Sequence, residues 1–154
     1  MAASQRTSLP PDPGNAWLAE HTTNPELTLA AWESRTLMPV HATQWLVAEV
    51  QLQPAMAAVR RMPEHKLGPI LIDMRMDRAW WLVPLDAADH LKDVPQALVL
   101  PPGWPLHCPS TQLAVGSRAW LEAPDGSGRL NDPVYLAAAL GPGGGPRLPA
   151  EAFG

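Results

Sequence analysis

Residues 68–84 read GPILIDMRMDRAWWLVP and decide the fold of the chain. Two apolar runs, GPILIDM and RAWWLVP, surround a short polar break. Runs rich in Ile, Val and Trp on either side of such a break are typical of a β-hairpin. The break carries two acids and two arginines, namely Asp73, Arg75, Asp77 and Arg78. Their charges largely cancel, so the simplest interpretation is a solvent-exposed hairpin tip.

The rest of the chain alternates short helices with short strands. Its 19 prolines exclude long helices, because proline breaks the hydrogen-bond ladder of a helix interior. The order of the elements predicts an α+β fold, an α/β sandwich with short helices packed on one mixed or antiparallel sheet. We predict helices at 24–35, 53–62, 86–93 and 131–140, and further strands at 43–50, 96–100 and 117–123.

The length of 154 residues fits one domain with a modest core. We predict a disordered polar segment at 1–15, a single domain at 16–140 and a flexible tail rich in glycine and proline at 141–154. Four prolines within PPGWPLHCPS, residues 101–110, predict a loop there, because proline cannot donate to a sheet ladder.

Charge and cysteine content limit the classes of function. The net charge is −4, which is unfavourable for non-specific binding to nucleic acid. The single cysteine, Cys108, excludes an internal disulfide and gives no sign of an oxidising compartment. There is no signal-peptide pattern and no apolar run near the roughly 20 residues of a membrane span. We therefore expect a cytoplasmic protein without a membrane partner.

The candidate catalytic residues are Asp73, Asp77 and His107. Two carboxylates could hold metal ions for phosphoryl transfer, but such a pair usually stands as Asp-x-Asp on one strand, and Arg75 occupies the second position here. His107 and Cys108 could form a nucleophilic dyad, although neighbours in an extended segment point to opposite faces. No paired Cys or His spacing indicates zinc, so we expect no metal site.

The candidate binding residues are basic and aromatic. Residues 60–78 carry a local positive excess, which indicates either a solvated face or a phosphate-binding patch. Two adjacent tryptophans should face opposite sides of the sheet, so one indole would be exposed for stacking if no helix covers its side. The set consists of Arg60, Arg61, Lys66, Arg75, Arg78, Trp80 and Trp81.

From Trp45 to about Leu140 the chain resembles the short actinobacterial proteins identified as bifunctional DNA primase/polymerase N-terminal (prim-pol) domains. The pieces that carry the resemblance are WLVAEVQLQPAMAAVRRM, LGPILID, RAWWLVPLDAADHL, PPGWPLHCPS, RAWLEAPDGSG and DPVYLAAAL. The resemblance implies a fold related to archaeo-eukaryotic primases, whose sheet carries metal-binding carboxylates and a histidine. This chain departs from the family in lacking an Asp-x-Asp and most of the N-terminal half.

Three hypotheses follow for the function. The first is a small, non-catalytic prim-pol-like domain that binds DNA, a nucleotide or a protein partner. The second is a nucleotidyl-transfer enzyme, and only this hypothesis calls for Mg²⁺ or Mn²⁺. The third is a regulatory protein-interaction domain without a nucleic-acid role. The departures from the family favour a binding domain over an enzyme.

Overall fold

The computed structural model describes residues 12–141, which form an α+β fold with two antiparallel sheets. The large sheet has the strand order β5-β2-β4-β3-β7, and the small sheet pairs β1 with β6. The strands are β1 (Met38–His41), β2 (Leu46–Gln51), β3 (Ile70–Asp73), β4 (Arg78–Val83), β5 (Ala97–Val99), β6 (Pro105–Cys108) and β7 (Arg118–Glu122). The helices are α2 (Pro13–Ala19), α3 (Pro25–Glu33), α4 (Leu52–Arg61), α5 (Ala87–Leu91) and α6 (Pro133–Leu140), with a short 3₁₀ turn, η1 (Glu64–Lys66).

The hairpin predicted from residues 68–84 is confirmed as β3 and β4, with Asp73 paired to Arg78 next to the turn. Because side chains alternate along a strand, β4 sends Ala79, Trp81 and Val83 to one face of the large sheet. Trp80 and Leu82 point to the other face. The hairpin therefore contributes to two separate cores.

Proline and its preceding cap residue start three of the helices. Asn24 accepts a hydrogen bond from the amide of Leu27 at the start of α3, and Asp132 accepts from the amide of Val134 at the start of α6. Such caps satisfy amides that would otherwise lack an intrahelical partner. These two starts confirm the sequence prediction. The third, Asp12 before α2, was not predicted.

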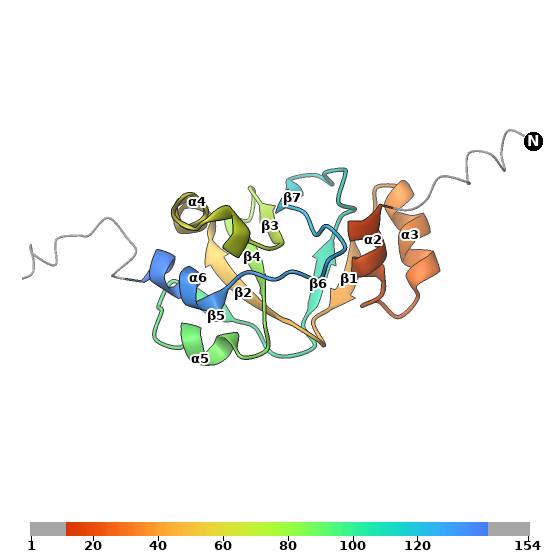
Figure 1. The fold of residues 1–154 in the computed structure, drawn as a ribbon. Helices are drawn as coiled ribbons and strands as arrows, with labels where there is room; N and C mark the ends of the chain where they lie inside the picture. The colour runs from red at the N-terminus through yellow and green to blue at the C-terminus, as the bar shows by residue number, and fades with distance from the viewer. Residues whose placement is uncertain (1–11, 142–154) are drawn as a thin grey trace, which may run out of the picture.

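The large sheet separates two layers of different composition (Figure 1). One face is covered by α4, α5 and α6, which pack on Ala48, Ile70 and Trp81 of the sheet. Part of the other face is covered by α2, α3 and the small sheet, with Trp45, Leu71 and Trp80 among the buried residues there. In Figure 1 the first group of helices lies at the left and α2 and α3 lie at the right. At the β5 end of this second face the cover is missing, since Leu98, opposite Glu49 of β2, is 58% exposed.

Two predictions from the N-terminal and proline-rich segments are wrong. The segment predicted as disordered reaches residue 15, but α2 begins at Pro13 after the N-cap Asp12. The loop predicted at 101–110 contains β6, which pairs with β1. Pro105 begins β6 and Pro109 follows its end, so neither proline interrupts the strand. Residues 1–11 and the predicted tail at 142–154 lie outside the described residues.

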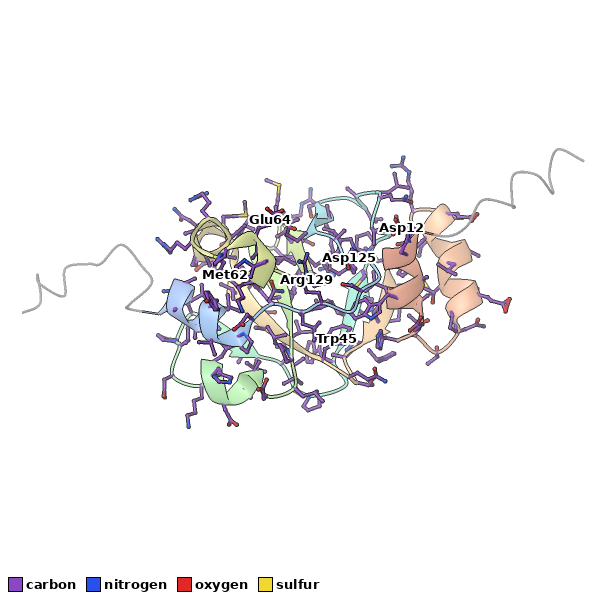
Figure 2. All side chains as sticks on the ribbon, in the orientation of Figure 1. Asp12, Trp45, Met62, Glu64, Asp125 and Arg129 are labelled. Atoms are coloured by element: carbon purple, nitrogen blue, oxygen red, sulfur yellow. The ribbon has the colours of Figure 1, made fainter. Side chains whose placement is uncertain are left out.

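The connection from β7 to α6 crosses between the two layers and is anchored by Asn131. Asp125 and Arg129, labelled in Figure 2, belong to this connection. The Asn131 side chain is fully buried, accepts from the Gly68 amide at 2.7 Å and donates to the carbonyls of Pro69 and Leu82 at 2.8 and 2.9 Å. It therefore ties the start of β3 to the end of β4. None of the helices within residues 12–141 has the length and apolar character that crossing a bilayer requires.

Candidate functional site

Asp73 lies at the end of β3 and is buried. Its carboxylate accepts hydrogen bonds from the amides of Arg75 and Met76, from Ser117 Oγ at 2.6 Å and from Arg118 Nε at 3.1 Å. Burial alone would raise the pKa of Asp73, but the hydrogen bonds and the Arg118 charge outweigh burial and hold the pKa below its usual value. These contacts engage the carboxylate fully, and they shape the hairpin turn.

Asp77 closes the same turn but makes different contacts. Its backbone takes the left-handed conformation, with φ 59°, which aspartate tolerates better than most residues. Its carboxylate accepts from Gln51 Nε2 at 2.8 Å, and its carbonyl accepts from the Leu52 amide at the start of α4. Asp73 and Asp77 therefore share no partner, and each has a structural contact of its own.

His107 and Cys108 lie on opposite faces of β6, as the alternation predicts. His107 is exposed, whereas Cys108 is fully buried next to the carbonyl of Leu106. Burial raises the pKa of the Cys108 thiol well above its usual value, which opposes formation of the thiolate. The dyad considered for these residues is therefore excluded by their placement.

No three His, Cys, Asp or Glu side chains within residues 12–141 group in a way that could hold a metal ion. His107 is linked to Asp73 only indirectly in the described residues, because Arg118 Nη1 donates to the His107 carbonyl at 2.9 Å and Arg118 Nε donates to Asp73. The three candidate catalytic residues, Asp73, Asp77 and His107, thus do not converge as a metal-dependent enzyme would require.

Both tryptophans of the adjacent pair are buried, with 4% of Trp80 and none of Trp81 exposed. They face opposite sides of the sheet as predicted, but the alternative of one indole exposed for stacking is wrong. The small sheet and the N-terminal helices cover the side of Trp80. The Trp80 indole donates to Glu49 Oε1 at 3.0 Å.

The candidate basic residues do not form one surface. Arg61 donates to the Ala139 carbonyl in α6, and Lys66 pairs with Asp132 at 3.5 Å, so both contact the helical layer. Arg78 extends from the opposite face of the large sheet and lies 3.7 Å from Glu49. Arg60 lies in the last turn of α4, and Arg75 lies in the hairpin turn. This placement of Arg61, Lys66 and Arg78 disfavours a single phosphate-binding patch made from this set.

Arg118 was missed by the sequence interpretation. Its side chain, only 13% exposed, binds Asp73, donates to the His107 carbonyl and lies 4.6 Å from the centre of the Trp80 ring. It connects β7, the hairpin and the small sheet. Nothing near Arg118 in the sequence signals these contacts, because Asp73 lies 45 residues earlier in the chain.

The uncovered end of the large sheet holds a groove of about 510 Å³. We call it the β2–β5 groove. Its volume lies in the range of small-ligand sites, and its lining is mixed in character. The lining residues are Glu49, Gln51, Pro54, Arg78, Pro95, Gln96 and Leu98. Of the candidate site residues from the sequence, only Arg78 lines this groove.

Comparison with known proteins found no relative of this chain. No family model, no curated protein and no solved structure matches the chain. The resemblance to prim-pol domains therefore stays a prediction from the sequence. The candidate site is the β2–β5 groove, selected by its geometry alone.

Proposed function

We propose that this domain acts by binding a protein partner in the β2–β5 groove and has no catalytic role. The observation that carries the proposal is the groove itself, an open site with both polar and apolar walls at the uncovered end of the sheet. Protein-binding sites commonly combine an apolar anchor point with hydrogen-bonding groups around it.

The placement of the other candidates supports a binding role. Asp73 is engaged by Ser117, Arg118 and two amides, so it has little capacity left for a metal ion. The basic residues extend from opposite faces of the sheet, which disfavours a track for a nucleic-acid backbone. Among DNA, a nucleotide and a protein, the three partner classes predicted from the sequence, these contacts therefore favour a protein.

Two further parts of the proposal come from the sequence. The domain is taken as a degenerate relative of prim-pol domains, in line with the missing Asp-x-Asp. The cytoplasm is taken as its compartment, since the only cysteine of the chain is Cys108 and it is a buried, unpaired thiol.

The test is a peptide-display selection against the full chain, followed by affinity measurements on the selected peptides. Leu98 lines the groove and is 58% exposed, so Leu98→Lys places a positive charge in the site without disturbing a core. Leu27 is also 58% exposed but lies in the first turn of α3, outside the groove lining, which makes Leu27→Lys the matched control. We expect peptides that bind Leu98→Lys at least tenfold more weakly and Leu27→Lys unchanged.

Three results would overturn the proposal. One is a selection in which no peptide depends on Leu98. Another is nucleotidyl-transfer activity, seen as Mn²⁺-dependent incorporation of nucleotides into a primer by the wild-type chain. Tight, salt-sensitive binding of single-stranded DNA that is lost in the double variant Arg60→Ala/Arg61→Ala would also replace the protein partner with nucleic acid.

A further inference from the structure

The polar lining of the β2–β5 groove is rich in hydrogen-bond acceptors. Gln51 donates its amide N–H to Asp77, and Gln96 donates its own to the Leu140 carbonyl. No hydrogen bond within residues 12–141 uses the Oε1 atom of either side chain. An amide whose NH₂ group is engaged presents its oxygen, so both glutamines offer acceptors to a ligand.

Glu49 adds a negative charge to these acceptors. Its Oε1 accepts from the Trp80 indole, which fixes the carboxylate in place. Its Oε2 lies 3.7 Å from Arg78 Nε, which is longer than a hydrogen bond. The Glu49 carboxylate therefore keeps an oxygen for a donor from outside the chain.

Arg78 is the one charged donor in the lining, and it is partly engaged. Its Nη1 donates to the Asp77 carbonyl at 2.9 Å, and its charge is shared with Glu49. The charges of Glu49 and Arg78 offset one another, so they select neither an anion nor a cation. The preference for a ligand rich in donors comes from the uncommitted acceptor atoms of Gln51, Gln96 and Glu49.

The apolar lining suits the stem of a long side chain. Leu98 projects from β5 opposite Glu49 of β2, and Pro54 and Pro95 complete the walls. Basic side chains lay their methylene stems on such surfaces while the charged group finds polar partners. The planar guanidinium of arginine carries five N–H donors, which can serve several acceptors at once.

We propose that the β2–β5 groove binds an arginine side chain of the protein partner, with Glu49 as its counter-ion and the oxygens of Gln51 and Gln96 as further acceptors. The inference rests on the proposed function and names the chemistry of its partner. The net charge of −4 on the chain is consistent with a basic partner.

The test uses a blocked tripeptide, acetyl-Gly-Arg-Gly-amide, and its citrulline counterpart, which has nearly the same shape but no charge. The indole N–H of Trp80 bonds directly to Glu49, so its NMR resonance, assigned by comparison with Trp80→Phe, reports on the carboxylate. We expect a saturable shift of this resonance with the arginine peptide at millimolar concentration. The citrulline peptide should bind at least tenfold more weakly.

Two variants localise the effect. Glu49→Gln keeps an acceptor for the Trp80 indole but removes the charge, so arginine binding should weaken at least tenfold. Glu64, labelled in Figure 2, is an exposed acid of η1 that does not line the groove, and Glu64→Gln should bind as the wild type does. Equal binding of the citrulline peptide, or no effect of Glu49→Gln, would overturn the assignment.

The outcomes separate this inference from the proposed function. Selected peptides that depend on Leu98 but contain no basic residue would preserve the protein-binding role and overturn the arginine assignment. A lysine peptide that binds as tightly as the arginine peptide would overturn the choice of arginine. A selection without any Leu98-dependent peptide would overturn the proposed function itself.

Discussion

At the scale of single residues, the pair of Asp73 and Arg118 joins the hairpin, β7 and the small sheet. Both side chains are largely buried. Asp73 also accepts a hydrogen bond from Ser117 Oγ, and Arg118 also donates to the His107 carbonyl. Removing one member of a buried pair leaves an uncompensated charge, which is the main cost of such a substitution.

We therefore expect Arg118→Ala to lower the free energy of unfolding by about 3–5 kcal/mol. Urea denaturation followed by circular dichroism measures the change. Arg75→Ala is the matched control, since Arg75 is an exposed arginine of the hairpin turn and its loss should cost less than about 0.5 kcal/mol. Equal losses in the two variants would show that Arg118 has no special structural role.

Asp73 makes stability depend on pH in a defined direction. Because the pKa of Asp73 is lower in the folded chain than in the unfolded chain, its contribution is complete above the usual aspartate pKa. The contribution disappears as the pH falls through the lowered, folded-state pKa. Denaturation midpoints of the wild type should therefore fall more steeply than those of Asp73→Asn as the pH drops below about 4. Parallel pH profiles for the two proteins would contradict this assignment.

The candidate site could be predicted from the sequence only in part. Asp73, Asp77 and Arg78 were correctly placed at the hairpin tip, because the pattern of residues 68–84 is local. The expectation that this tip is solvent-exposed was wrong for Asp73, which is buried against Ser117 and Arg118 from a distant part of the chain. The groove was not predicted, since Glu49, Arg78 and Leu98 meet only when β2 pairs with both β4 and β5. The burial of Trp80 could not be predicted from a local pattern either, because segments distant in the sequence cover its side chain.

At the scale of elements, local signals were sufficient for most of the chain. The helices predicted at 24–35 and 131–140 are present as α3 and α6, and the strand predicted at 43–50 is present as β2. The small sheet was missed because β6 lies between prolines that look like loop signals. Its partner β1 lies far earlier in the chain, and a local sequence pattern does not indicate so distant a partner.

Asn131 anchors the connection before α6, and its removal should affect the whole hairpin. Asn131→Ala leaves the Gly68 amide and the Pro69 and Leu82 carbonyls without this partner in a buried site. We expect a loss of about 3 kcal/mol or more in the free energy of unfolding. Asn24→Ala, which removes only the exposed cap of α3, should cost about 1 kcal/mol in the same urea experiment. A smaller loss at Asn131 than at Asn24 would contradict the anchoring role.

At the scale of the whole molecule, the net charge of −4 predicts how a basic partner approaches. Electrostatic attraction speeds the encounter of oppositely charged partners and is screened by salt. We expect the association rate of an arginine-containing binding peptide to fall several-fold between about 20 and 200 mM salt, measured by stopped-flow fluorescence. An association rate that rises or stays constant with salt would show that charge does not guide this encounter.

The order β5-β2-β4-β3-β7 also has a consequence for how the chain folds. Only β3 and β4 are joined by a short turn, whereas the paired residues Glu49 and Trp80 are 31 positions apart and Asp73 and Arg118 are 45 apart. Closing a long loop costs chain entropy before any contact forms. The hairpin is thus the one strand pair of the large sheet that can form early, and we expect its residues to have the highest φ-values in the folding transition state.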